Sequence, residues 1–181
     1  PIFIPMLKVG IIGASGYTGI ELIRLMAAHP KAELEAVTSR TYAGRKIAEV
    51  HPHLAGILDL TFESVAVKDI AKRCGAVFTA VPHGTAMEYV PELMKGGAKV
   101  IDLSADYRLP ATVFEKIYGM KHKDPRKAVY GLTELHPEVK DAKIVANPGC
   151  YPTGCVLAVA PLAASGNVES IVFDCKSGIS G

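Results

Sequence analysis

A cysteine between two prolines is the residue best placed for chemistry. Cys150 lies within residues 147–154 (NPGCYPTG), between a short apolar run and a helical pattern. Proline has no backbone N–H, so Pro152 suits the first turn of a helix and places Cys150 close to the helix start. There the helix dipole and free N–H groups favour a thiolate and can stabilise an oxyanion on an attacked carbonyl. Cys150 is therefore predicted to be a nucleophile, whereas small buried cysteines are expected at the other three positions, Cys74, Cys155 and Cys175.

A glycine-rich turn is the second candidate site. Glycines spaced as GxxGxxG lie between a predicted strand and a predicted helix, in Gly13-Ala14-Ser15-Gly16-Tyr17-Thr18-Gly19. A turn without bulky side chains lets backbone N–H groups and the positive end of the helix approach a pyrophosphate, and the last glycine permits close helix packing. Such turns also occur for steric reasons alone. Because the flanking strand and helix are those that dinucleotide binding requires, all of these residues are predicted to bind the cofactor.

The residues after the second predicted strand indicate which dinucleotide is bound. An NAD enzyme usually places an acid there to hold the ribose 2′-hydroxyl, but this sequence has Ser39 and Arg40. A hydroxyl and a guanidinium can bind and neutralise a 2′-phosphate, which favours NADP over NAD. Glu33 and Glu35 fall within the strand rather than at its end and are discounted. The alternative for Arg40 is a solvated loop arginine.

Two further positions follow predicted strands. Pro82 and His83 come after a buried strand, at the edge where ligands bind in open α/β sheets, and are predicted to lie beside the cofactor. The alternative for His83 is an ordinary loop role. His51 and His53 flank a proline but have no evident third ligand, so no metal site is predicted.

Arg108 is the main candidate for substrate binding. It follows another strand end and can hold a carboxylate or phosphate through two parallel hydrogen bonds. Ser104 and Asn147 are assigned to the same substrate site. The competing interpretation of Arg108, a structural salt bridge with Asp106 or Glu134, is equally compatible with the sequence.

Alternating apolar strands and helical patterns predict how these residues are positioned. Strands are expected at residues 8–13, 33–38, 76–81, 98–103, 143–146 and 169–175, and helices at 20–26, 85–95 and 152–164. Residues 40–62 and 104–142 are expected to form long loops with short helices. The fold class is therefore α/β, a Rossmann-like, doubly wound, mostly parallel sheet. The sequence stops in a loop after the last expected strand, which is typical of a fragment that ends just inside a second domain.

Composition excludes several classes of function. Twenty basic and 18 acidic residues give a net charge of +2, which is too balanced for a face that binds nucleic acid. No apolar run approaches the roughly 20 residues of a membrane helix, and no secretory signal is visible, so a cytoplasmic protein without a membrane partner is expected. The four cysteines show no CxxC spacing, which argues against a zinc or dithiol site.

The motifs together resemble the N-acetyl-gamma-glutamyl-phosphate reductases of arginine biosynthesis. The resemblance spans nearly all of the chain from Met6 onward and is carried by residues 13–19, 80–84, 102–109, 130–135 and 145–154. The cysteine motif is the most discriminating, since the related aspartate-semialdehyde dehydrogenases share the glycine turn but lack the proline-flanked cysteine.

The resemblance implies a specific chemistry and domain arrangement. The Cys150 thiolate would attack an acyl phosphate, expel phosphate and leave a thioester, which hydride from NADPH would convert to an aldehyde. Residues 6–149 would form the NADP-binding domain, and residues 150–181 the start of a truncated α+β catalytic domain. Ser177 and Gly178 resemble the start of a glycine-rich loop beside the cofactor. The family's catalytic histidine and most of its oligomer contacts would lie beyond this chain, so the fragment alone is expected to be inactive and the full-length protein a homo-oligomer.

Two alternatives remain open. The first is the homologous reductase of aminoadipyl phosphate in lysine biosynthesis, which the cysteine motif does not separate from the glutamyl enzyme. The second is a binding module that holds NADP without turnover. An enzyme predicts that thiolate-driven alkylation of Cys150 is faster than that of a free thiol, and a binding module does not.

Overall fold

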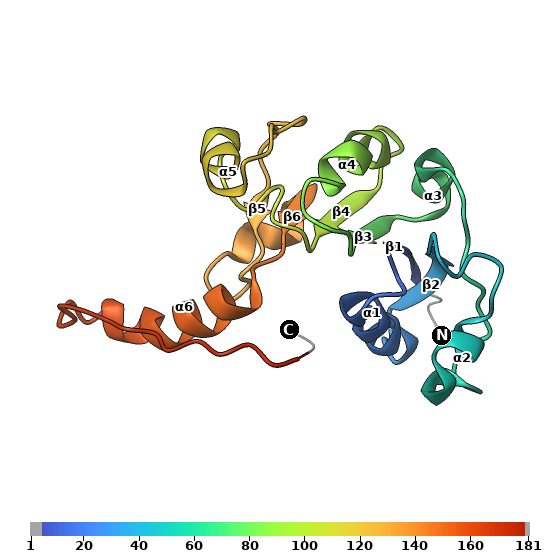
Figure 1. Cartoon of the computed structure of the whole chain (residues 1–181), viewed down its shortest axis with the longest axis horizontal. Helices are drawn as coiled ribbons and strands as arrows, with labels where there is room; N and C mark the ends of the chain where they lie inside the picture. The colour runs from blue at the N-terminus through green and yellow to red at the C-terminus, as the bar shows by residue number, and fades with distance from the viewer. Residues whose placement is uncertain (1–4, 180–181) are drawn as a thin grey trace.

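A parallel sheet of six strands forms the centre of the computed structural model, which describes residues 5–179 (Figure 1). The strand order is β2-β1-β3-β4-β6-β5, and every neighbouring pair is parallel. The strands are β1 (Leu7–Ile12), β2 (Ala32–Val37), β3 (Ala76–Thr79), β4 (Lys99–Asp102), β5 (Val129–Tyr130) and β6 (Ile144–Ala146). The predicted Rossmann-like α/β fold is confirmed.

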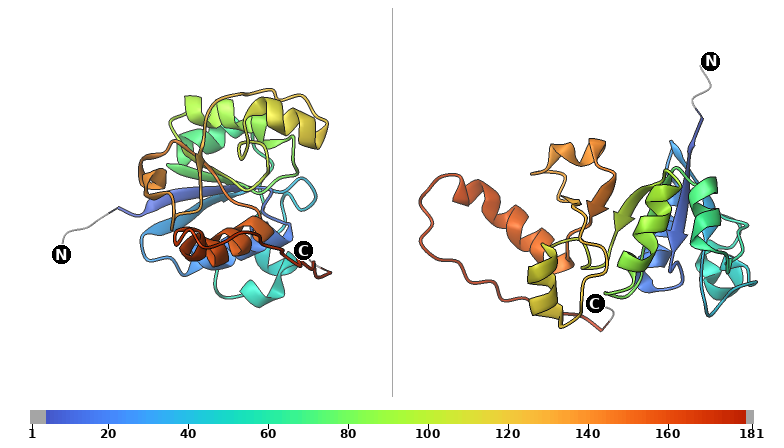
Figure 2. Two further views of the ribbon diagram at one scale, coloured as in Figure 1. Left: turned by 90° about the vertical axis from the view of Figure 1, so that its left-hand side faces the viewer. Right: turned by 90° about the horizontal axis from the view of Figure 1, so that it is seen from above.

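Helices cover both faces of this sheet (Figures 1 and 2). One face carries α1 (Tyr17–Ala27), α2 (Ile47–Val50) and the short 3-10 helix η1 (Pro52–Leu54). The other face carries α3 (Val67–Arg73), α4 (Ala86–Lys95) and α5 (Ala111–Tyr118). A second 3-10 helix, η2 (Pro137–Asp141), precedes β6. Parallel strands that are buried on both faces need near-continuous apolar runs, which explains why the sequence pattern predicted most of them correctly.

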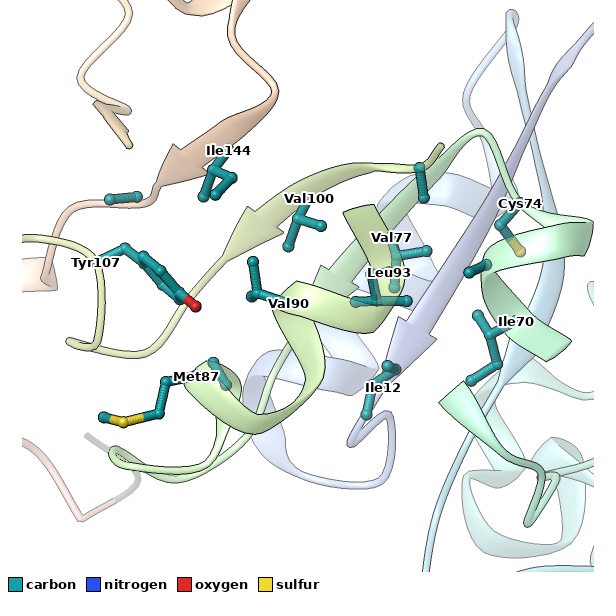
Figure 3. Close-up of a cluster of buried hydrophobic side chains, with 14 of the residues drawn as sticks. Ile12, Ile70, Cys74, Val77, Met87, Val90, Leu93, Val100, Tyr107 and Ile144 are labelled. Carbon is teal, nitrogen blue, oxygen red and sulfur yellow. The ribbon is translucent and has the colours of Figure 1, made fainter. Parts of the chain in front are cut away.

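The packing of α3 and α4 on the sheet shows how the apolar residues hold these layers together (Figure 3). Ile70 on α3 and Leu93 on α4 are buried in one cluster with Val77 and Val100 from the neighbouring strands. Burying a side chain of this size stabilises the fold by about 1.5–3 kcal/mol. Because Val77 and Val100 are register partners on adjacent strands, this cluster also fixes the relative positions of β3 and β4.

The structure corrects the predicted elements in three places. Helix α3 and strand β5 were not predicted, because seven and two residues are too few to show a clear periodicity. The strand expected at 169–175 is wrong, since residues 167–178 form neither helix nor strand. A strand exists only where its backbone N–H and C=O groups pair with a neighbour, and no ladder among the described residues includes this segment.

The last helix, α6 (Cys150–Ala163), leaves the sheet after β6 and extends away from it, and the chain then turns back toward the sheet (Figures 1 and 2). None of its residues is buried. It begins two residues before the predicted start at residue 152. Within residues 5–179, no helix is long and apolar enough to cross a membrane.

Candidate active site

A cavity opens at the carboxyl edge of the sheet, where the connections from β1 and β3 diverge. Strand β1 lies between β2 and β3, which makes this the switch point where doubly wound folds bind ligands. The cavity has a volume of about 830 Å³. The turns after β1, β2 and β3 and the start of α4 provide part of its lining, including Gly13, Ser15, Gly16, Ser39, Arg40, Pro82, Thr85 and Tyr89.

The first glycine of the turn is required by conformation and by packing. Gly13 has a positive φ of 82°, and a Cβ at this position would lie 2.3 Å from the carbonyl oxygen of Ala80. The last glycine permits close packing, since a Cβ on Gly19 would lie 2.5 Å from the carbonyl carbon of Ala14. Ala14 is fully buried and its N–H donates to the carbonyl of Thr38 at 2.8 Å. Ala14 and Gly19 therefore shape the turn and do not line the cavity.

Gly16 differs from the other two glycines. Its φ is −80°, and no atom lies within 4 Å of a Cβ built on it. Neither backbone strain nor packing within the described chain explains a glycine here, although it lines the cavity at the N-cap of α1. A ligand approaching the backbone would explain it, because an anion can then reach the free N–H groups of the helix start. Tyr17 and Thr18, the first two helical residues, are exposed and outside the lining, so only their backbone N–H groups are placed to take part.

The turn after β2 places its two predicted cofactor residues differently. Ser39 is buried, its hydroxyl oxygen lies 2.9 Å from that of Ser15, and it accepts a hydrogen bond from the N–H of Tyr42. This serine links the β1 and β2 turns. Arg40 is exposed, and its Nη2 donates to the hydroxyl of Tyr89 on α4 at 2.8 Å. The guanidinium is therefore held against one wall of the cavity and is not a freely solvated loop arginine.

The one carboxylate in the cavity lining is already paired. Glu63 accepts hydrogen bonds from both terminal nitrogens of Arg73, at 2.6 and 2.9 Å. These bonds, assisted by Glu35, raise the pKa of the Arg73 guanidinium above its ordinary value. Arg40 forms no ion pair with any described residue. The lining therefore presents an uncompensated positive charge.

His83 does not line the cavity. Its Nδ1 accepts a hydrogen bond from the N–H of Ala105 at 2.9 Å, which ties the turn after β3 to the loop after β4. Asp106 reinforces this link, since it accepts from the N–H groups of Gly84 and Met87 at the start of α4. This hydrogen bond gives His83 a role in holding the two loops together. A contact between His83 and the cofactor stays a prediction.

Ser104 is also a structural residue. It is buried, and its hydroxyl donates to Asp102 at 2.7 Å while accepting from the N–H of Asp106. Thr79 donates to the same Asp102 carboxyl group at 2.7 Å. Burial raises the pKa of Asp102, and the hydrogen bonds from Thr79 and Ser104 oppose that shift. These bonds place the Ser104 hydroxyl inside the network below the loop after β4. Direct binding of substrate by Ser104 stays a prediction.

Arg108 forms neither of the salt bridges considered from sequence. Its Nε donates to the carbonyl of Asn147 and its Nη2 to the carbonyl of Leu103, both at 2.7 Å. A Cβ on Gly149 would lie 3.3 Å from its Nη1. The guanidinium thus lies against the turn that precedes Cys150, and Nη1 has no hydrogen-bond partner among the described residues. The side-chain amide of Asn147 donates to the carbonyl of Pro148, so Asn147 mainly shapes the turn.

Cys150 is exposed and is the first residue of α6. The first intrahelical hydrogen bond runs from Thr153 N–H to the carbonyl of Gly149, so the N–H groups of Cys150 and Tyr151 remain available. The hydroxyl of Thr153 also donates to Gly149, at 2.9 Å. The predicted position of the cysteine at a helix start is confirmed, and it lies at the same edge of the sheet as the cavity.

The other cysteines differ from Cys150 and from one another. Cys74 is buried as predicted, and burial raises the pKa of its thiol to about 11. Cys155 is only half-buried and Cys175 is exposed, so burial was wrongly predicted for Cys175, and their sulfur atoms lie 3.8 Å apart. The cause is the segment after α6, which forms no strand and packs into no core.

Two predicted cofactor residues lie elsewhere, and one cavity residue was missed. Ser177 and Gly178 belong to the exposed segment after α6 and do not line the cavity. Tyr89 was missed because a tyrosine on a helix face is usually a packing residue. Its position in the first turn of the helix after β3, at the edge of the sheet where ligands bind, is the sequence signal that could have identified it as a cavity residue. Among residues 5–179, no group of three or more histidines, cysteines or acids could hold a metal ion.

Comparison with known protein families shows to which class of protein the chain belongs. Residues 8–142 match the family described as semialdehyde dehydrogenase, NAD binding domain. The chain belongs to this family and carries its nicotinamide-cofactor-binding domain. Two solved structures share the fold: aspartate semialdehyde dehydrogenase II from Vibrio cholerae, complexed with ASA (TM-score 0.63, 15% identity), and aspartate semialdehyde dehydrogenase with NADP from Candida albicans (TM-score 0.57, 19% identity). Each comparison covers 88% of this chain and 47% of the other.

Curated relatives are much more similar in sequence. N-acetyl-gamma-glutamyl-phosphate reductase of Methanothrix thermoacetophila is 64% identical over 176 residues, which cover 97% of this chain and 52% of the relative. The reductase of the same name from Archaeoglobus fulgidus is 58% identical over 97% of this chain and 53% of the relative. The chain spans about half the length of the curated relatives it matches.

Proposed function

We propose that the cavity at the β1/β3 switch point binds NADP. Gly16 and the free N–H groups at the start of α1 fit the pyrophosphate. Arg40, which forms no ion pair with a described residue, fits the ribose 2′-phosphate. Ser15 and Pro82 complete the nearby wall. Residues 6–149 would then form the NADP-binding domain, and residues 150–181 would begin the catalytic domain.

The reaction that fits this arrangement is reduction of N-acetyl-glutamyl 5-phosphate to N-acetyl-glutamate 5-semialdehyde, a step of arginine biosynthesis. The Cys150 sulfur attacks the acyl carbon, a carbon–sulfur bond forms, and phosphate leaves with the electron pair of the broken carbon–oxygen bond. When bound in this cavity, NADPH would supply the hydride for reduction of the thioester on Cys150. The resulting hemithioacetal on Cys150 then releases the aldehyde and regenerates the thiolate.

The residues around Cys150 have defined roles in this proposal. The N–H groups of Cys150 and Tyr151 stabilise negative charge on the attacked carbonyl oxygen. Arg108, held by two backbone carbonyls beside the cysteine turn, uses its free Nη1 to bind the phosphate or a carboxylate of the substrate. Asn147 contributes through its carbonyl, which orients Arg108.

One observation carries the proposal: an exposed cysteine at a helix start shares the carboxyl edge of the sheet with a cavity of about 830 Å³ lined by the glycine turn. Strands β1 and β6, which precede the glycine turn and Cys150, are separated by β3 and β4. Three strand spacings of about 4.8 Å place them roughly 14 Å apart. An extended dinucleotide bound at the β1 turn can therefore reach toward the cysteine.

The acyl-transfer half of the reaction provides the test. Full-length wild-type protein incubated with N-acetyl-glutamyl 5-phosphate should release phosphate and gain the mass of the acyl group on Cys150, measured by intact-protein mass spectrometry. Cys150→Ser should abolish both signals and retain NADPH binding. Substantial phosphate release by the serine variant would refute the role of Cys150. A parallel assay with aminoadipyl phosphate distinguishes the substrates, and faster acylation by the longer compound would overturn the glutamyl assignment.

A further inference from the structure

Tyr89 is a polar cavity residue to which the proposed reaction assigns no role. It lies on α4, lines the cavity and accepts the hydrogen bond from Arg40 Nη2 at 2.8 Å. We propose that the Tyr89 hydroxyl and the Arg40 guanidinium form one recognition site for the ribose 2′-phosphate, which makes Tyr89 a specificity-determining residue for NADP over NAD. This inference rests on the proposed binding of NADP.

The direction of the hydrogen bond gives Tyr89 its chemistry. A guanidinium can only donate, so the Tyr89 oxygen is the acceptor and its own proton is not used in this contact. That proton can be donated to a phosphate oxygen beside the N–H groups that Arg40 has left free. The two side chains together present donors of two kinds, one charged and one neutral, to the same dianionic group.

Tyr89 also gives Arg40 a defined position. The tyrosine is half-buried and packs against the core cluster that contains its neighbour Val90. The start of α4 is fixed because Asp106 accepts hydrogen bonds from the Gly84 and Met87 N–H groups. A freely moving arginine side chain loses rotamer freedom when it binds a ligand. The hydrogen bond from Arg40 to Tyr89 restricts the arginine before binding, which reduces this entropy loss.

The charges around this pair favour an anion. Glu63, in the lining, is held by Arg73 through two hydrogen bonds. Glu88, next to Tyr89 in the sequence, is paired with Lys123. Each nearby carboxylate therefore has its own cation, and the positive charge of Arg40 is left for the phosphate.

Binding of the oxidised dinucleotides to the purified chain tests the proposal. Titration calorimetry would compare NADP⁺ and NAD⁺ for wild type and Tyr89→Phe, which removes only the hydroxyl. Loss of a hydrogen bond to a charged group should raise the Kd for NADP⁺ at least about tenfold, and the Kd for NAD⁺ should stay within about twofold. Tyr118→Phe is the matched control, since Tyr118 is also half-buried but lies outside the cavity lining. It should leave both constants unchanged.

The effect of Tyr89→Phe in an Arg40→Gln background shows whether the two side chains bind the phosphate jointly or independently. Tyr89→Phe should weaken NADP⁺ binding less in the Arg40→Gln background than in wild type, because part of its effect is exerted through Arg40. Strictly additive losses would overturn the joint site. Equal losses for NADP⁺ and NAD⁺ in Tyr89→Phe would show a structural role and overturn it as well.

The same titrations distinguish failure of this inference from failure of the proposed function. A wild-type chain that binds NAD⁺ as tightly as NADP⁺ would contradict the proposed choice of NADP. A wild-type preference for NADP⁺ that survives Tyr89→Phe would leave the proposed function intact and reject the role of Tyr89.

Discussion

The sheet with its covering helices and the segment from α6 onward are both rich in apolar residues, but these residues are buried in the first region and not in the second. Residues such as Val77, Val90 and Val100 are fully buried between layers. Helix α6 has the sequence CYPTGCVLAVAPLA, yet none of its residues is buried, and Val172 in the following segment is almost fully exposed. Apolar residues are thus buried only where a second layer covers them.

The same two regions also show that a helix can form without a neighbouring element, whereas a strand cannot. Helix α6 forms without a covering layer because its hydrogen bonds are internal, whereas residues 169–175 form no strand because none of the described strands pairs with them. A helix that is apolar on all sides is typical of one that is covered by other parts of a protein. Substitutions in the two regions should therefore have different effects on stability.

The largest expected effect is at the glycine turn. Gly13→Ala would force a residue with a Cβ to adopt a φ of 82° and would place that Cβ 2.3 Å from the Ala80 carbonyl oxygen. Strain and overpacking of about 1–3 kcal/mol each should lower the free energy of unfolding by ~4 kcal/mol in urea denaturation.

Gly154→Ala is the matched control in α6. No atom lies within 4 Å of a Cβ at Gly154, and alanine favours helix, so the free energy of unfolding should stay constant or rise by about 0.5–1 kcal/mol. A Gly13→Ala protein as stable as wild type would show that the turn rearranges freely.

Leucine truncations compare the two regions directly. Leu93 on α4 is fully buried, and Leu93→Ala should lower the free energy of unfolding by ~3 kcal/mol, because it leaves a cavity in the core. Leu162 on α6 is 58% exposed, and Leu162→Ala should change the free energy of unfolding by less than about 0.5 kcal/mol. Chemical denaturation of both variants measures the difference. A loss at Leu162 equal to that at Leu93 would indicate that α6 is covered in solution.

A smaller, pH-dependent effect should come from Cys74 in the core. Burial raises the pKa of its thiol to about 11, above that of a free cysteine. The unfolded chain therefore loses the proton first, and the contribution to stability is lost as the pH rises from about 9 to 11. Wild type should lose about 1–2 kcal/mol more than Cys74→Ala between pH 8 and pH 10.5 in urea unfolding.

Ile70→Val controls for loss of buried volume near the same thiol. This variant should be less stable than wild type by a similar amount at both pH values, because it removes no titratable group. An identical pH dependence in wild type and Cys74→Ala would show that the thiol ionises equally in the folded and unfolded states.

Much of the candidate site could be predicted from sequence because its signals are local. The glycine spacing, the serine and arginine after β2 and the proline-flanked Cys150 each indicate a role within a few residues. The hydrogen-bond partners of His83, Ser104 and Arg108 could not be predicted, because they lie in other loops or on main-chain atoms. Ser104 and His83 resemble ligand-binding residues in sequence, but one forms hydrogen bonds within a buried network and the other holds two loops together.

The sequence by itself determined the alternation of strands and helices, the parallel sheet and the position of Cys150 near a helix start, because apolar periodicity and proline geometry act locally. Only the tertiary structure decided which polar groups are free to bind a ligand. It paired Glu63 with Arg73, placed Arg40 on Tyr89 and directed Arg108 to the backbone near Cys150. Hydrogen bonds and charges depend on distances between loops that are far apart in the chain, and those distances are set when the sheet brings the ends of its strands to one edge.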